Sequence, residues 1–380
     1  MTTTIDNEQK TLNVPNLRFP EFEGEWEEST IEKQFELYSG NTPSRINKEL
    51  FNGTINWISS GELKEHYIYS TKERISQEAA NNLKLLSVGT FVIAIYGLEA
   101  EGVRGTGSIT QEPSTISQAC MAFTPKGEIT NEFLYSWYKK HGHVIGVKYA
   151  QGTKQQNLSY DILEKFKISY PNVKEQDKLN LFFSLIDKRI STQNKIIEKL
   201  ETLIKGIAQN IVRYNKPNVR LSDCLSCSSS TLQESDVSEH GTYPVYGANG
   251  VVGYLDNYNT ENEAIYIIKD GSGVGSTSYV TGKCSATGTL NILRAKEGYS
   301  LQYLYYMLKV FNFEPYKTGM AIPHIYFKDY GKAKVFCPTY KEQLQYARLL
   351  SAIDKRLTVE HGLLTNLSLQ KQYLLRQMFI

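Results

Sequence analysis

The sequence SLIDKRI at residues 184–190 returns as SAIDKRL at residues 351–357, a shift of 167 positions. A second shared stretch precedes each copy at the same distance, PNVKEQ at residues 171–176 and PTYKEQ at residues 338–343. Across residues 171–190, nine of the twenty ungapped positions are identical to their partners. Identity at this level over a fixed shift is typical of an internal duplication.

The duplication extends upstream of these stretches at the same shift. Gln151-Gly152 falls on Thr318-Gly319, and Asn157-Leu158 falls on His324-Ile325. Because the match is weaker there, each repeat consists of a variable module followed by a more similar tail.

Each tail has the apolar periodicity of one long helix with a single buried seam. In the first tail the seam positions alternate by four and three residues: Ile186, Ile190, Gln193, Ile197, Leu200, Ile204, Ile207 and Ile211. The same shift gives the second seam: Ile353, Leu357, Glu360, Leu364, Leu367, Lys371, Leu374 and Met378. The patterns begin near Val173 and Tyr340. Each lasts about forty residues, which predicts helices of about 60 Å at about 1.5 Å per residue.

Both seams carry a polar residue at the same position, Gln193 and Glu360, and the second carries another at Lys371. The simplest way to bury two matching seams is to pack them against each other. Antiparallel pairing would place one module at each end of the pair, whereas parallel pairing would place both at one end. The sequence alone favours neither orientation strongly. The alternative is two separate amphipathic helices, each lying on its own domain.

The two modules repeat one order of expected elements. In the first, a strand at residues 91–96 precedes a glycine-rich turn and a helix at residues 131–140. In the second, a strand at residues 264–269 precedes a glycine-rich stretch, a strand at 290–293 and a helix at 301–308. We therefore expect an α+β fold in which two mixed α/β modules are separated by two long helices.

Domain boundaries follow from these elements. The stretch NKPN at residues 215–218 predicts the end of the first long helix. The expected divisions are an N-terminal segment at 1–25, modules at 26–157 and 217–325, and tail regions at 158–216 and 326–380.

The composition is that of a soluble protein with a net charge near zero. Of 380 residues, 41% are hydrophobic and 22% charged, with neither an N-terminal apolar region nor a membrane-length apolar run. We expect a cytoplasmic protein that has no membrane contact and whose five cysteines are free thiols. Lys+Arg and Asp+Glu number 13 and 13 in residues 28–155, and 7 and 10 in residues 218–325. Nucleic-acid binding would therefore require the cations to gather on one face.

Sequence motifs of catalysis and cofactor binding are missing. Gly282-Lys283 is followed by Cys284, so it does not form a nucleotide-binding P-loop. The stretch GSGVG at residues 271–275 lacks the third glycine at dinucleotide-binding spacing. The Cys224-Leu-Ser-Cys227 pair has no second pair and no nearby His pair to complete a zinc site. These absences favour a binding protein, and two divergent modules suit an asymmetric, two-part target.

Four features together resemble the specificity subunit (HsdS) of type I restriction-modification systems. They are VPNLRFPEFEGEW at residues 14–26, SGNTPS at 39–44, GTYPVYGANG at 241–250 and the doubled tail. The resemblance covers nearly the whole chain. It implies two target-recognition domains, each reading one half of a split double-stranded DNA site, and two helices that pair antiparallel and set the spacing.

The resemblance also implies the partners and cofactors. The helices would dock two methyltransferase subunits, which methylate adenine with S-adenosylmethionine, and the complex would add motor-nuclease subunits that use ATP and magnesium. This chain would be non-catalytic and would bind none of these cofactors. A rival interpretation is a fused nuclease or methyltransferase, which would need a metal-binding acidic cluster or a cofactor loop. Another rival is a coiled-coil scaffold, which leaves the polar loops unexplained.

Candidate DNA-binding residues are polar side chains on loops that can enter the major groove. In the first module they are Ser44, Arg45, Arg104, Thr153, Lys154, Gln155, Gln156 and Asn157. In the second module they are Asn249, Lys269, Ser272, Thr318, Met320 and His324. The alternative is that the segments ending at Asn157 and His324 only anchor each module to its tail.

Candidate partner-binding residues form a repeated polar row on the tails. They are Asp187, Lys188, Arg189, Asp354, Lys355 and Arg356, which we expect to lie off the buried seams. We interpret them as equivalent docking sites for two identical methyltransferase subunits. The alternative is solvated ion pairs, which contribute little to stability.

Overall fold

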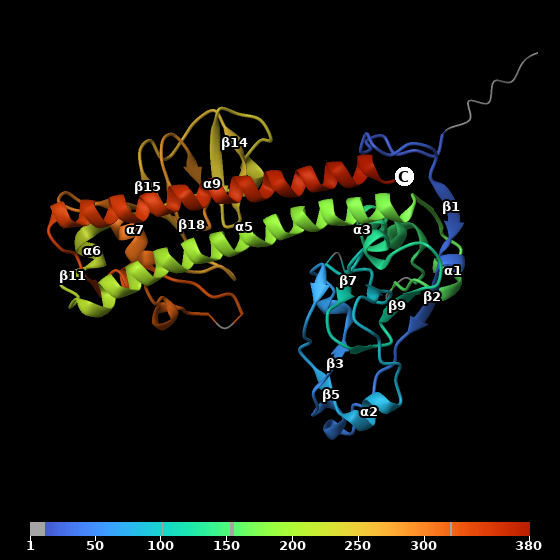
Figure 1. The fold of residues 1–380 in the computed structure, drawn as a ribbon. Coiled ribbons are helices and arrows are strands. Elements are labelled where there is room, and N and C mark those ends of the chain that lie inside the picture. The colour runs from blue at the N-terminus through green and yellow to red at the C-terminus, as the bar shows by residue number, and fades with distance from the viewer. Residues whose placement is uncertain (1–11, 101, 153–155, 320) are drawn as a thin grey trace, which may run out of the picture. The chain divides into compact units, whose positions relative to one another are not determined.

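The computed structural model describes residues 12–100, 102–152, 156–319 and 321–380. The chain divides into two compact units, one of residues up to Thr192 with Leu364–Ile380 and the other of Gln193–Leu363. Each unit holds one globular module and a part of both long helices, α5 (Val173–Tyr214) and α9 (Tyr340–Met378) (Figure 1). The helix starts and lengths predicted from the seams are confirmed.

In the first unit the two long helices run in opposite directions. Leu179 of α5 belongs to the same core cluster as Met378 of α9, and further along α5, Asp187 forms an ion pair with Lys371 of α9. Residue numbers thus rise on one helix as they fall on the other. Lys371, the second polar residue of the α9 seam, is therefore paired with the carboxylate of Asp187.

In the second unit the same two helices are also antiparallel. Gln193 contacts Glu360, and Ile211 shares a core cluster with Ala347. Every predicted seam position on both helices is buried or half-buried, because these positions face the partner helix or a module. The orientation that periodicity left open is therefore antiparallel, and the interpretation as two unpaired helices is wrong.

The first module is built around a five-stranded sheet with a helix packed on it. The sheet order is β2 (Phe35–Ser39), β9 (Cys120–Pro125), β6 (Phe91–Ala94), β7 (Gly107–Thr110) and β4 (Tyr67–Ile68). The smaller sheets are β5 (Arg74–Ile75), β3 (Ile55–Ile58) and β8 (Ser114–Ile116), and β1 (Glu27–Thr30) with β10 (Lys167–Tyr170). The α-helices are α1 (Ile31–Gln34), α2 (Gln77–Asn81), α3 (Asn131–Tyr149) and α4 (Tyr160–Leu163).

The second module repeats this plan with a four-stranded main sheet and a shorter packed helix. Its main sheet has the order β12 (Leu225–Ser229), β18 (Leu290–Ala295), β15 (Ala264–Ile268) and β16 (Thr277–Val280). The smaller sheets are β14 (Gly250–Leu255), β13 (Tyr243–Gly247) and β17 (Ser285–Ala286), and β11 (Val219–Arg220) with β19 (Lys334–Val335). The α-helices are α6 (Leu221–Cys224), α7 (Leu301–Lys309) and α8 (Phe327–Tyr330).

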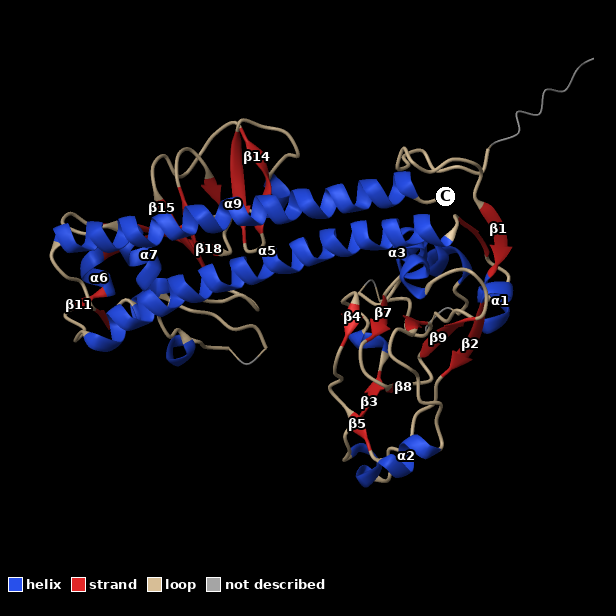
Figure 2. Cartoon of the chain, in the orientation of Figure 1, coloured by secondary structure: helices blue, strands red, loops and turns tan. Residues whose placement is uncertain are grey.

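The duplication is visible in the strand pairing as well as in the sequence. Strands β2-β9-β6-β7 and β12-β18-β15-β16 have the same order, and the neighbours within each set of four are antiparallel. The parallel pairs are β3 with β8 and β4 with β7 in the first module, and β13 with β17 in the second. Figure 2 shows the strands confined to the modules, with α5 and α9 as uninterrupted helices. The predicted α+β class and the predicted helices on each module are confirmed.

Candidate nucleic-acid interface

In the first module, the polar segment before α4 has Gln151 and Asn157 at its two ends, and Asn157 lies beside the end of β6. The backbones of Gln151 and Asn157 exchange two hydrogen bonds of 2.8 Å, which close the loop between them. Asn157 also forms a bridge with Tyr96, just past the end of β6. Gly152 begins the loop with a φ of +112°, a left-handed conformation that glycine adopts without strain. The two ends of the segment are therefore joined to each other, and Asn157 joins them to the module at Tyr96.

Arg104 and Gln156 come together at this loop, although they are 52 residues apart. The Arg104 guanidinium donates to the Gln156 side-chain oxygen at 3.3 Å and to the Leu98 backbone oxygen at 2.9 Å. The backbone N–H of Gln156 donates to the Glu99 carboxylate at 2.8 Å. This bond is the largest of the causes that lower the pKa of Glu99. Two residues that the sequence indicated separately thus form one polar site.

The second module builds the same loop at a shift of 167 residues. The backbones of Thr318 and His324 exchange hydrogen bonds of 2.9 and 2.7 Å. His324 forms a bridge with Asp270, just past the end of β15, and its Nδ1 lies 2.6 Å from the Asp270 carboxylate. Gly319, like its counterpart in the first module, has a positive φ, of +89°. The loop closure is shared by the two modules, but its side chains differ.

Lys269 and Ser272 belong to the same region of the second module. The backbone oxygen of Lys269 accepts a 2.9 Å bond from Ile325, and Gly271, beside Ser272, donates to Pro323 at 3.0 Å. The glycine-rich stretch and the segment ending at His324 are therefore adjacent. Four of the predicted residues lie outside the described part of the chain: Thr153, Lys154, Gln155 and Met320.

The structure does not bring the remaining candidates to these loops. In the described part of the chain, no hydrogen bond links Ser44, Arg45 or Asn249 to the two closed loops. Arg45 makes two bonds to the Glu73 carboxylate, at 2.5 and 2.8 Å, and its guanidinium carbon lies 4.2 Å from the centre of the Phe51 ring. The guanidinium is thus part of an exposed ion pair on the module surface, away from the closed loops.

The polar row on the long helices is not a uniform surface. Lys188, Arg189 and Lys355 are exposed, as expected. Asp187 has a side chain only 19% exposed, and its partners are Lys371 and His66. The expectation that Asp187 belongs to an exposed row is wrong, because this side chain faces His66 of the first module and Lys371 of α9.

The repeated positions in the second unit are also engaged within the chain. The Asp354 carboxylate accepts a 3.3 Å bond from the hydroxyl of Tyr306, so this aspartate is half-buried against α7. Arg356 is exposed but forms an ion pair with Glu360 one turn along the helix. Lys355 and Arg356 are thus the exposed charges of this copy.

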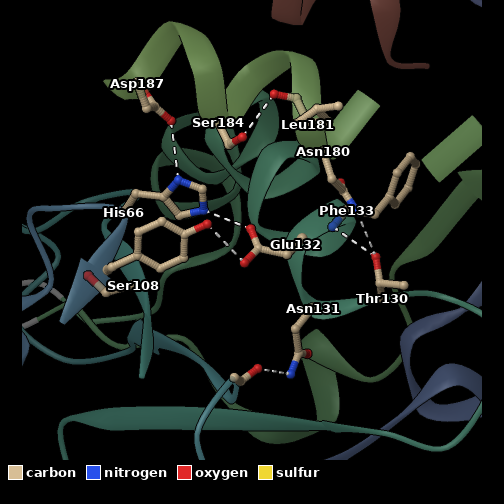
Figure 3. Close-up of polar contacts among 12 residues, drawn as sticks. His66, Ser108, Thr130, Asn131, Glu132, Phe133, Asn180, Leu181, Ser184 and Asp187 are labelled. Carbon is tan, nitrogen blue, oxygen red and sulfur yellow. Dashed lines mark hydrogen bonds and ion pairs between the residues drawn. The ribbon is translucent and has the colours of Figure 1, made fainter. Parts of the chain in front are cut away.

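His66 connects the first module to α5 (Figure 3). Its Nε2 lies 2.9 Å from the Glu132 carboxylate and its Nδ1 lies 3.3 Å from the Asp187 carboxylate. The ring is stacked between Tyr67 and Tyr135, with centroid distances of 4.0 and 3.9 Å. Burial acts to lower the pKa of His66, but the bonds to the two carboxylates outweigh it, so the pKa is raised.

A family model described as the type I restriction modification DNA specificity domain matches the chain twice, over residues 23–202 and 218–369. The chain belongs to this family. The two matches correspond to the two repeats, so each copy of the specificity domain consists of one module and most of its long helix.

Individual relatives of this specificity protein carry related names. The MjaIX specificity subunit of Methanocaldococcus jannaschii is 28% identical over 185 residues, which are 46% of this chain and 42% of that protein. The chain thus matches less than half the length of this relative. The EcoprrI specificity subunit of Escherichia coli is 22% identical over 85% of this chain and 86% of its own length.

The fold of the specificity protein is also found in solved structures. The S subunit of the type I restriction-modification system of M. genitalium is similar with a TM-score of 0.65 and 19% identity. The similarity covers 97% of this chain and 99% of that chain. It supports the architecture of two modules and two long helices.

Sequence reasoning missed the His66 cluster. His66, Glu132 and Asp187 are separated by more than fifty residues from one another, and no spacing rule links them. Within the described residues, no group of three or more His, Cys, Asp or Glu side chains is placed to hold a metal ion. Among the described helices, none combines the length with the apolar composition that a bilayer-spanning helix needs.

Proposed function

We propose that the chain is the DNA specificity subunit of a type I restriction-modification complex, in which each module reads one half of an asymmetric double-stranded site. The observation that carries this proposal is the repeated loop closure, Gln151 with Asn157 and Thr318 with His324. The same pair of backbone hydrogen bonds occurs twice at a shift of 167 residues, and the side chains around it differ between the two modules. Such a pair suits a target whose halves differ.

The side chains at the two loops have different reading chemistry. In the first module, Arg104 and Gln156 offer the guanidinium and amide groups that pair with guanine and adenine in the major groove. In the second module, Ser272 and His324 offer a hydroxyl and an imidazole. A good two-bond contact discriminates against a wrong base by about 1–3 kcal/mol. The two half-sites should therefore have different sequences.

In this proposal each of the expected domains has its own role. Residues 26–157 and 217–325 act as the recognition domains, after an N-terminal segment at 1–25. The tail regions at 158–216 and 326–380 carry the helices that set the spacing between the half-sites. The antiparallel contacts of α5 and α9 within each unit support this role.

The helices also dock the partner subunits in this proposal. Two methyltransferase subunits bind at the repeated positions around Lys188 and Arg189 and around Lys355 and Arg356. Motor-nuclease subunits join through the complex. S-adenosylmethionine, ATP and magnesium serve those partners in the cytoplasm, and this chain is non-catalytic. Incubating the chain alone with DNA, magnesium and S-adenosylmethionine should give neither methylation nor cleavage.

The test is adenine methylation mapped by single-molecule sequencing in a host that carries the complete system. The proposal predicts a motif of two short, different halves separated by a spacer of fixed length. Deleting this chain while keeping the methyltransferase should abolish methylation at that motif. A single uninterrupted motif, or methylation that persists without this chain, would contradict the proposal.

A further inference from the structure

A cavity of about 370 Å³ lies in the second module beside the closed loop. Its walls come from the end of β12, the residues after β15, the start of β18 and α8. The lining includes Ser229, Lys269, Asn291, Tyr326 and Lys328. The cavity is distinct from the loop residues that we assign to base reading, although Lys269 borders both.

Two lysines, Lys269 and Lys328, and one carboxylate, that of Asp270, line this cavity in the described part of the chain. Neither Lys269 nor Lys328 has an ion-pair partner there. The Asp270 carboxylate lies 2.6 Å from the Nδ1 of His324 and forms no ion pair with either lysine. The Nζ of Lys328 lies 5.3 Å from the centre of the Tyr326 ring. Two cations from separate segments are therefore available to one anion.

The rest of the lining is a polar floor and an apolar wall. Asn291 is only 4% exposed, and its side-chain oxygen accepts a 2.8 Å bond from the Ser229 hydroxyl. Ile325, Tyr326 and Phe327 form the apolar side. Cations beside an apolar wall suit a sugar–phosphate segment, because the phosphate oxygens contact the lysines while the deoxyribose packs on carbon atoms.

The described residues at the equivalent place of the first module have different chemistry. Ile95 makes the same two backbone bonds as Lys269, from its N–H to Ala119 and from Leu158 to its oxygen. Met121 occupies the strand position of Asn291, because each pairs with a serine of the neighbouring strand. The shift of 167 residues places Asp161 at the position of Lys328. Apolar and acidic side chains thus replace the cations.

We propose that this cavity binds the sugar–phosphate backbone of DNA next to the half-site of the second module, with Lys269 and Lys328 contacting phosphate. The inference rests on the proposed DNA-binding function. The contact carries no sequence information, since phosphates are the same at every base pair. It gives the second module a phosphate contact for which the equivalent residues of the first module, Ile95 and Asp161, offer no cation.

The experiment compares the salt dependence of DNA binding between variants of the complex of this chain with its methyltransferase. Fluorescence anisotropy gives the binding constant of wild type and of the Lys269→Ala, Lys328→Ala double variant at several salt concentrations. We expect weaker binding of specific and non-specific duplexes by the same factor. The slope of log K against log salt should become shallower by about 0.9 for each phosphate that a lysine no longer neutralises.

Two further variants separate charge from folding. Lys269→Arg with Lys328→Arg keeps both charges and should keep the wild-type slope. Lys332→Ala removes a lysine that is 77% exposed and lies outside the cavity, so it should also leave the slope unchanged. Melting temperatures should be equal across the set.

Three outcomes would overturn the inference. An unchanged slope in the double alanine variant, with a wild-type complex that binds DNA, would refute the phosphate contact alone. A changed methylation motif in that variant would show that the cavity reads bases, which contradicts a backbone site. A wild-type complex that does not bind DNA would refute the proposed function together with the inference.

Discussion

The side chain of Gln193 donates a hydrogen bond of 3.1 Å to the backbone oxygen of Glu360, the residue that holds the same position in the second repeat. It also contacts the Glu360 carboxylate. Both residues are buried, at 5% and 2% exposure. A duplicated helix packed antiparallel on its copy brings one position against its own repeat. Here that position is polar in an apolar seam, so any sliding of the helices would leave buried polar groups unpaired.

The first prediction concerns this pair. Glu360→Leu alone should lower the melting temperature, because it leaves the buried Gln193 amide without its carboxylate partner. Gln193→Leu with Glu360→Leu should restore or raise it, since an apolar pair of similar size removes the burial cost of both polar groups. Differential scanning calorimetry of the three proteins tests this. A single variant as stable as the double variant would contradict the role assigned to the pair.

The pair also predicts a dependence on pH. The bond from Gln193, and then Arg356, lower the pKa of Glu360. A lowered carboxylate pKa adds stability above the unfolded value of about 4.3, and this stability is lost as pH falls through the folded pKa. The stability difference between wild type and Glu360→Leu should therefore shrink below about pH 4.

The second prediction concerns His66. His66→Phe keeps a ring between Tyr67 and Tyr135 but removes the bonds to Glu132 and Asp187. We expect a loss of about 1.5–3 kcal/mol in the free energy of unfolding near pH 6, as for hydrogen bonds to charged groups. Because the pKa of His66 is raised, its contribution is complete below the unfolded value of about 6.5 and is lost as pH rises through the folded pKa.

Urea unfolding at pH 6 and pH 9 measures this difference. The deficit of His66→Phe should be larger at pH 6. His143→Ala is the control, because His143 is exposed on the same module. A deficit that grows with pH would contradict the charged-pair interpretation of the cluster.

The third prediction assigns Gln156 to one half-site. Gln156→Ala removes the side-chain oxygen that Arg104 contacts and should relax base preference in one half of the methylated motif, by about 1–3 kcal/mol at one base pair. Methylation sequencing reads both halves at once. Gln77→Ala, an exposed glutamine of the same module, should change neither half. Equal loss at both halves would indicate a structural role for Gln156 instead.

The fourth prediction concerns partner docking. Lys188→Ala with Arg189→Ala should weaken one methyltransferase site, and adding Lys355→Ala with Arg356→Ala should weaken both. Asp187 is left unchanged, because its pairing with Lys371 and His66 is internal to the first unit. Light scattering measures the assembly. A complex of two methyltransferases with the fourfold variant, as stable as wild type, would remove these residues from the docking surface.

The sequence predicted the long helices and their seams because helical periodicity over forty residues is a strong signal. The periodicity did not predict their relative direction, since a seam pattern looks the same to a parallel or an antiparallel partner, and only the family resemblance implied antiparallel pairing. The sequence indicated the glycine-rich stretch and the later polar segment of each module as separate candidates. It did not indicate that the two lie side by side, because that depends on strand pairing. Arg45 shows the same limit: its partner Glu73 is 28 residues away, and no local pattern links them.

The most direct test of two independent DNA readers is an exchange of residues 26–157 for the first module of another specificity subunit. The exchanged chain is expressed with its methyltransferase, and adenine methylation is mapped by single-molecule sequencing. We predict that one half of the motif changes while the other half is retained. An unchanged motif, or a change in both halves, would contradict the account.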